Sequence, residues 1–177
     1  MSSSKRLGLT LGSALLMWSL AVGSAHAARP DSWITARARI ALLTTDGAGR
    51  TAVKVDTEHG RITLHGKVSS QAEKDRAEAA VRSVEGVTGV RNLVEVVPGT
   101  LKEAVKASDS DVKRAVEVAL KADKRLDGIK VASVDNGVVL LAGSDQAIAQ
   151  KLLAIETAYD CAGVRRVASQ IETLDTK

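Results

Sequence analysis

The sequence has few aromatic residues and almost no cysteine. Its 177 residues include two tryptophans, one tyrosine, no phenylalanine and the single cysteine Cys161. Proteins that bind single-stranded nucleic acid stack the bases on aromatic side chains, so this composition argues against a nucleic-acid partner. A single cysteine excludes an internal disulfide framework and any metal site made of cysteines alone.

The chain also lacks an apolar run of the length that crosses a membrane. The apolar stretch near the N-terminus is interrupted by glycine and serine and is shorter than the ~20 residues of a spanning helix. Residues 1–27 instead have the three parts of an export signal peptide: the basic Lys5 and Arg6, an apolar stretch, and a small-x-small cleavage site. We therefore expect cleavage between Ala27 and Ala28 and a mature protein in the periplasm. No cysteine stands at the cleavage site, so we do not expect a lipoprotein.

Neither charge sign dominates the expected mature chain. The full sequence has 25 Lys and Arg against 21 Asp and Glu, which gives a net charge of +4. Lys5 and Arg6, in the expected signal peptide, supply two of these four charges. A chain this close to neutrality is not expected to bind polyanions through net charge alone.

Glycine and valine positions recur along the chain at a fixed offset of 77 residues, which indicates an internal repeat. The offset is 78 for the helix that precedes them, because the first copy has one insertion near residues 44–50. The glycines that recur are Gly60, Gly66 and Gly86 in the first copy and Gly137, Gly143 and Gly163 in the second.

Each copy has the hydrophobic pattern of a helix, two strands, a second helix and a last strand. A strand that returns after a helix pairs in parallel, so the pattern predicts an α+β fold of two tandem αββαβ modules. Each module then has a three-stranded mixed sheet with two helices on one face. We expect the first module over residues 28–98 and the second over 110–177. Pro98-Gly99 opens the linker 99–109 between them, with a short helix over 100–107.

The repeated residues resemble the BON domain family. The resemblance is carried by Gly60-Arg61-Ile62-Thr63-Leu64-His65-Gly66 and Gly86-Val87-Thr88-Gly89-Val90-Arg91-Asn92, and by Asn136-Gly137-Val138-Val139-Leu140-Leu141-Ala142-Gly143. It implies a non-enzymatic protein of the periplasm that binds phospholipid and is linked to osmotic stress or outer-membrane integrity. It brings no catalytic residues and no cofactor.

The second helix of the second copy departs from the repeat on one face. The first copy carries three charged residues on this face, where the second copy has Leu152, Ile155 and Tyr159, and Ile148 continues the same face. Their spacing places all four on one side of a helix, and we call them the apolar stripe. The sequence leaves three placements open: the core of its own module, a contact with the first module, or a surface that meets lipid or a partner protein.

Basic residues accompany the apolar stripe. Lys151 lies among its members, and Lys121, Lys124 and Arg125 end the preceding helix. Near an anionic membrane each such residue contributes about 1 kcal/mol, although the acidic residues interspersed among them favour an ordinary solvated surface. The candidate lipid-binding or partner-binding residues are therefore the apolar stripe and Lys151.

The sequence predicts neither a metal site nor an active site. His59 and His65 are the nearest approach to a metal pair, but no third ligand stands at a suggestive spacing, and the second copy has Asn136 and Ala142 at these positions. No nucleophile elbow or phosphate loop occurs. Cys161 aligns with Val84, which predicts a buried small hydrophobic residue.

These patterns favour a non-catalytic envelope protein that binds anionic phospholipid surfaces. The alternative is a periplasmic protein-interaction or chaperone-like factor, in which the apolar stripe holds a partner or an unfolded protein. The sequence leaves the oligomeric state open.

Overall fold

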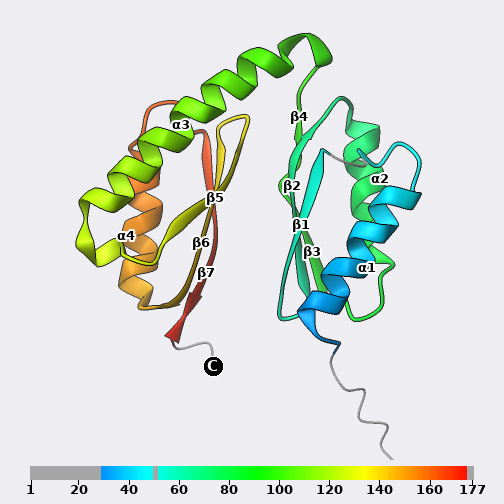
Figure 1. Ribbon diagram of the computed structural model, residues 1–177, viewed down its shortest axis with the longest axis horizontal. Helices are drawn as coiled ribbons and strands as arrows, with labels where there is room; N and C mark the ends of the chain where they lie inside the picture. The colour runs from blue at the N-terminus through cyan, green and yellow to red at the C-terminus, as the bar shows by residue number, and fades with distance from the viewer. Residues whose placement is uncertain (1–28, 50–51, 175–177) are drawn as a thin grey trace, which may run out of the picture.

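The computed structural model describes residues 29–49 and 52–174, and shows two modules with the same architecture (Figure 1). The expected signal peptide, with its cleavage site between Ala27 and Ala28, lies outside these residues. The α+β class and the tandem modules predicted from the repeat are confirmed.

The first module has a mixed sheet with two helices on one face. Strand β2 is central: β1 pairs with it antiparallel, and β3 and β4 pair with it in parallel as two segments of one interrupted strand. Helix α2 begins where the Ser70 side chain accepts a hydrogen bond from the backbone N–H of Glu73. The elements are α1 (Asp31–Thr44), β1 (Val53–Glu58), β2 (Arg61–Val68), α2 (Gln71–Arg82), β3 (Gly89–Asn92) and β4 (Glu95–Val96).

The second module repeats this arrangement. Strand β6 is central, with β5 antiparallel and β7 parallel to it. The elements are the 3₁₀ turn η1 (Gly99–Leu101), α3 (Lys102–Ala122), the 3₁₀ turn η2 (Lys124–Leu126), β5 (Lys130–Asp135), β6 (Val138–Gln146), α4 (Ile148–Tyr159) and β7 (Arg166–Thr173).

Helix α3 differs from the sequence-based expectation. A linker over 99–109, with its own short helix, was expected before the first helix of the second module. The structure instead has one continuous helix of 21 residues from Lys102 to Ala122. No glycine or proline occurs within it, so nothing interrupts the backbone hydrogen bonds once the helix has started.

Each module has its own apolar core, packed between its helices and one face of its sheet. Aliphatic residues and alanine form both cores, and the small alanines Ala38 and Ala77 are fully buried in the first. The largest buried side chains are Ile34, Leu42, Ile62 and Leu64 in the first core and Leu120, Leu126, Ile129, Leu141 and Ile171 in the second.

The other faces of the two sheets face each other. Figure 1 shows the sheets at the centre of the molecule and the helices on the outside. A small apolar cluster lies between the sheets, formed by Leu93 of the first module with Ala132, Leu140 and Ala168 of the second. The layers therefore follow the order helices, sheet, sheet, helices, so the outer faces of the helices stay free of the contact between modules.

In each module an aspartate carboxylate accepts hydrogen bonds from the backbone of the hairpin turn and holds it in place. Asp31 accepts hydrogen bonds from the backbone N–H groups of His59 and Gly60, at 2.7 and 2.8 Å. Both turn residues have positive φ, 50° and 75°, as a tight two-residue hairpin turn requires. Because Asp31 is the first residue of α1, its carboxylate holds the turn against the start of this helix.

In the second module the corresponding acceptor is Asp109, which lies inside α3 rather than at a helix start. It accepts from the backbone N–H groups of Asn136 and Gly137, both at 2.9 Å, and its side chain is 7% exposed. It also receives the ammonium of Lys67 from the first module at 2.6 Å. Asp109 therefore joins its own hairpin to the other module.

We expect the two aspartates to differ in their contribution to stability. Asp31→Asn should cost about 1 kcal/mol, because one turn hydrogen bond weakens at a partly exposed site. Asp109→Asn should cost about 3 kcal/mol, because it also removes the carboxylate nearest to the Lys67 ammonium. Urea unfolding followed by circular dichroism measures both, and equal losses would contradict the joining role of Asp109.

Candidate functional site

The outer face of α4 carries an exposed apolar surface. Ile148, Leu152 and Tyr159 are 51%, 61% and 50% exposed, whereas Ile155 is half-buried and packs against the core of the second module. The opposite side of the helix buries Ala154 and Ala158 completely. Of the placements that the sequence left open, the structure has three members of the apolar stripe facing solvent, with Ile155 as their link to the core.

Lys151 does not point away from the protein with the apolar stripe. Its side chain is half-buried, and its ammonium donates a hydrogen bond to the backbone carbonyl of Ile171 at 2.9 Å. Lys151 therefore anchors α4 to β7, and its charge faces the end of the sheet.

The exposed basic residues lie at the N-terminal end of α4. Gln150 caps this end: it accepts from the N–H of Ala147 and donates to the carbonyl of Arg125, which ties α4 to η2. The guanidinium of Arg125 is paired with Asp123 at 2.6 Å. Lys121 and Lys124 are exposed beside this pair, so two lysines lie near the start of the apolar stripe.

A second polar site lies between the sheets, where the sequence indicated nothing. Within the first module, the His65 imidazole Nε2 lies 3.0 Å from Asp56. Across the module boundary, the His65 Nδ1 lies 3.7 Å from Asp135, and the Lys67 ammonium lies 2.6 Å from Asp109 and 3.7 Å from Asp135. We call these five residues the junction cluster.

The junction cluster holds the His65 imidazole in its charged form. Burial disfavours the charged ring, but Asp135 and Asp56 outweigh this effect and raise the pKa of His65 to about 9. The Nδ1 to Asp135 distance of 3.7 Å is too long for a hydrogen bond, so this contact between buried atoms is purely electrostatic. Hydrogen bonding to His65 lowers the pKa of Asp56 in turn.

Sequence reasoning missed the junction cluster because its pattern is ambiguous. Thr63, His65 and Lys67 alternate with core residues along β2, and this alternation is typical of a strand with one solvated face. In the structure that face meets the other module, and Thr63 and His65 are 3% and 5% exposed. The contacts that bury them come from residues far away in sequence, so spacing gave no signal.

Cys161 is less buried than predicted. The structure has it half-exposed at the edge of the second core, with its thiol 3.5 Å from the backbone carbonyl of Thr157. Burial, with a smaller effect from Asp160, raises the pKa of the thiol. The neutral thiol is therefore favoured.

The stability of the protein should fall as the pH rises from 6.5 to 9. Below pH 6.5 the His65 imidazole is charged in both folded and unfolded chains, and the junction cluster stabilises the folded chain fully. Between 6.5 and 9 the unfolded chain loses this proton while the folded chain keeps it, so folding loses about 1 to 2 kcal/mol. Urea unfolding at pH 6 and pH 9.5 measures this loss.

The matched variant for this measurement is His65→Gln. Its side chain carries no charge at either pH, so we expect a lower stability that changes less between pH 6 and pH 9.5. An unchanged pH dependence in His65→Gln would show that other groups cause it.

Among residues 29–49 and 52–174, no helix combines the length and apolarity needed for a membrane span.

Comparison with known proteins identifies the modules. The BON domain matches residues 30–98 and 108–175. Osmotically-inducible protein Y of Escherichia coli (strain K12) is 33% identical over 148 residues, which cover 81% of this chain and 72% of that protein.

Two further matches are shorter or more distant. The 21 kDa hemolysin of Actinobacillus pleuropneumoniae is 40% identical over 67 residues, which cover 38% of this chain and 34% of the hemolysin. Among solved structures, the C-terminal domain of CdsD, the structural protein of the Type III secretion system of Chlamydia trachomatis, is 14% identical with a TM-score of 0.34. The alignment covers 78% of this chain and 96% of that domain. Because the BON domain matches most of the sequence in two segments that coincide with the two modules, the chain belongs to the BON domain family and carries two copies of the domain.

Proposed function

We propose that this chain is a non-catalytic, exported envelope protein that attaches to anionic phospholipid surfaces from the periplasm and supports tolerance of osmotic stress. The observation that carries the proposal is the exposed apolar surface of α4, formed by Ile148, Leu152 and Tyr159. The expected signal peptide supports export. Similarity to a protein named for osmotic induction supports the physiological role.

The geometry of α4 suits a shallow contact with a membrane interface. The helix has 12 residues and lies on the outside of the molecule, so its length of ~18 Å can rest parallel to a flat surface. Burying about half of each exposed apolar side chain contributes on the order of 1 kcal/mol per residue. Tyr159 has an apolar ring and a polar hydroxyl, a combination that favours the headgroup region.

Charge adds to this contact without dominating it. Lys121 and Lys124 are exposed next to the N-terminal end of α4, and each contributes about 1 kcal/mol near an anionic surface. The sum of the apolar and charged contacts is a few kcal/mol, which gives weak and reversible attachment. A protein with this affinity binds to the membrane surface and dissociates from it readily.

Replacement of two exposed stripe residues tests the proposal. Ile148→Glu/Leu152→Glu should weaken sedimentation with vesicles of phosphatidylglycerol and phosphatidylcholine roughly tenfold, because two apolar contacts become two like-charge repulsions. Neither side chain belongs to a core, so the variant should unfold at the same urea concentration as the wild type.

The control places two glutamates at exposed apolar positions of other helices. Ile40 of α1 and Val118 of α3 are 52% and 64% exposed, so Ile40→Glu/Val118→Glu adds equal charge away from the stripe. It should sediment with vesicles as the wild type does. Equal sedimentation of all three proteins would contradict the proposal.

The chaperone-like alternative gives a different result in the same set of proteins. It requires that the wild type suppress the aggregation of an unfolded client, that Ile148→Glu/Leu152→Glu lose this activity, and that none of the proteins bind vesicles. That result would assign the apolar stripe to protein partners and overturn the lipid proposal.

A further inference from the structure

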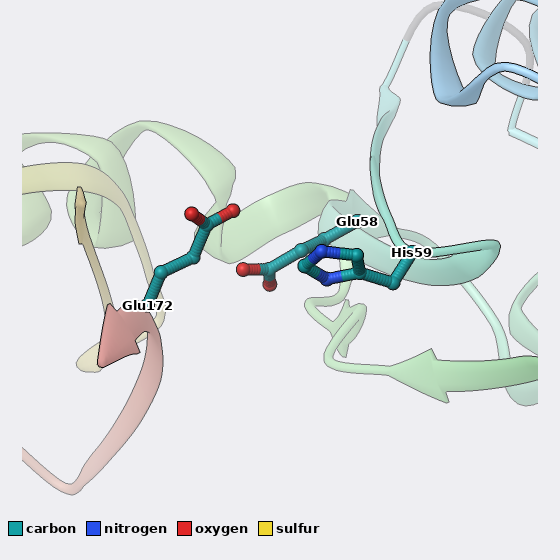
Figure 2. Close-up of side chains that lie close together, drawn as sticks. All are labelled: Glu58, His59 and Glu172. Atoms are coloured by element: carbon teal, nitrogen blue, oxygen red, sulfur yellow. The ribbon is translucent and has the colours of Figure 1, made fainter. Parts of the chain in front are cut away.

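Three metal-ligating side chains meet at the boundary between the two modules. Glu58 and His59 come from the first module and Glu172 from the second, and one ligand atom of each lies within 4.8 Å of the other two. Figure 2 shows Glu58 and His59 side by side, with the carboxyl group of Glu58 extending toward Glu172 on the other module. This cluster shares no residue with the junction cluster or the apolar stripe.

The backbone of all three residues is held in place, two of them by strands and the third by a hydrogen-bonded hairpin turn. Glu58 is the last residue of β1, and Glu172 lies in β7 one residue before its end. His59 follows Glu58 in the hairpin turn that Asp31 holds through two backbone hydrogen bonds. The imidazole therefore projects from a fixed backbone rather than from a long loop.

The two carboxylates face each other in a partly dehydrated setting. Both side chains are half-buried. Among the residues that the structure describes, neither glutamate has an ion-pair partner. Such a pair of carboxylates is stabilised by a proton or by a cation placed between them.

Three basic side chains line the same hollow, Arg61, Arg91 and Lys151, and two of them are bound elsewhere. The ammonium of Lys151 is bound to the carbonyl of Ile171 at 2.9 Å, and the guanidinium of Arg91 lies 3.4 Å from the carbonyl of Ser169. The hollow has a volume of about 440 Å³ and is open to solvent. It therefore has room for a hydrated cation beside the carboxylates.

We propose that Glu58, His59 and Glu172 form a binding site for a divalent transition-metal ion of the Zn²⁺ class that links the two modules. Imidazole nitrogen with carboxylate oxygen is a donor set that Zn²⁺ accepts, at about 2.0–2.2 Å from each atom. The imidazole favours such an ion over Ca²⁺ or Mg²⁺, which prefer oxygen alone. Three protein ligands leave a coordination position for water.

The site exists only while the modules are docked, because each module supplies part of it. Metal binding therefore favours the docked arrangement by mass action and should raise the stability of the whole protein. This role is independent of the lipid proposal, since the apolar stripe lies on another surface.

Zinc titration of the untagged protein tests the site. Isothermal titration with ZnCl₂ should show one saturable site in the wild type, weakened at least tenfold by His59→Asn and by Glu172→Gln. Asparagine already occupies the equivalent turn position as Asn136, also with φ of 50°, so His59→Asn keeps the fold. The melting temperature should rise with ZnCl₂ in the wild type and much less in either variant.

The control is Glu117→Gln, which removes an exposed carboxylate from α3 and should bind Zn²⁺ as the wild type does. Absence of saturable binding to the wild type would overturn the proposal. So would equal binding by the wild type, His59→Asn and Glu172→Gln, because the ion would then bind elsewhere. A loss in Glu117→Gln as large as in Glu172→Gln would reduce the effect to net charge and would equally overturn it.

Discussion

The docking of the two modules depends on the contact between the Lys67 ammonium and the Asp109 carboxylate. This carboxylate also holds the backbone N–H groups of Asn136 and Gly137, so the hairpin of one module and a strand of the other share a single acceptor. Buried charges are costly unless they are paired, and a shifted docking would leave both of these unpaired. The contact therefore selects one relative position of the two sheets, and the small apolar cluster around Leu140 fills the space beside it.

Divergence between the two copies makes this docking possible. The first copy supplies the cationic side chains His65 and Lys67, whose counterparts in the second copy are Ala142 and Ser144. The second copy supplies Asp109 and Asp135 as acceptors. Both acceptors have acidic counterparts in the first copy, Asp31 and Glu58, so the two copies differ here mainly in their basic residues. The repeat thus keeps its internal architecture, while the basic residues on the docked face of the first sheet have no basic counterparts in the second module.

The sequence predicted the helices and strands, which depend on neighbouring residues, but not the contacts between residues far apart in the chain. The alternation of apolar residues predicted the paired strands, and the departure from the repeat singled out the residues of α4. The Pro98-Gly99 break was read as the start of a linker, yet the chain enters a helix within three residues. Glu58 and Glu172 meet only through docking, 114 positions apart. A search for a third ligand near His59 in sequence therefore failed, since the ligand lies on the other module.

The four-layer order separates the two surfaces that the protein offers. The inner faces of the two sheets are covered where the modules dock. Ile148, Leu152 and Tyr159 of α4 are exposed in this docked arrangement, so no rearrangement of the modules is needed to present them. Lys151 lies between these surfaces, and its ammonium cannot bind a lipid phosphate and the carbonyl of Ile171 at once. Releasing it would cost the bond that anchors α4 to β7. In the proposed membrane contact Lys151 would therefore stay in place, and the affinity of the apolar stripe would come mainly from apolar contact rather than from charge.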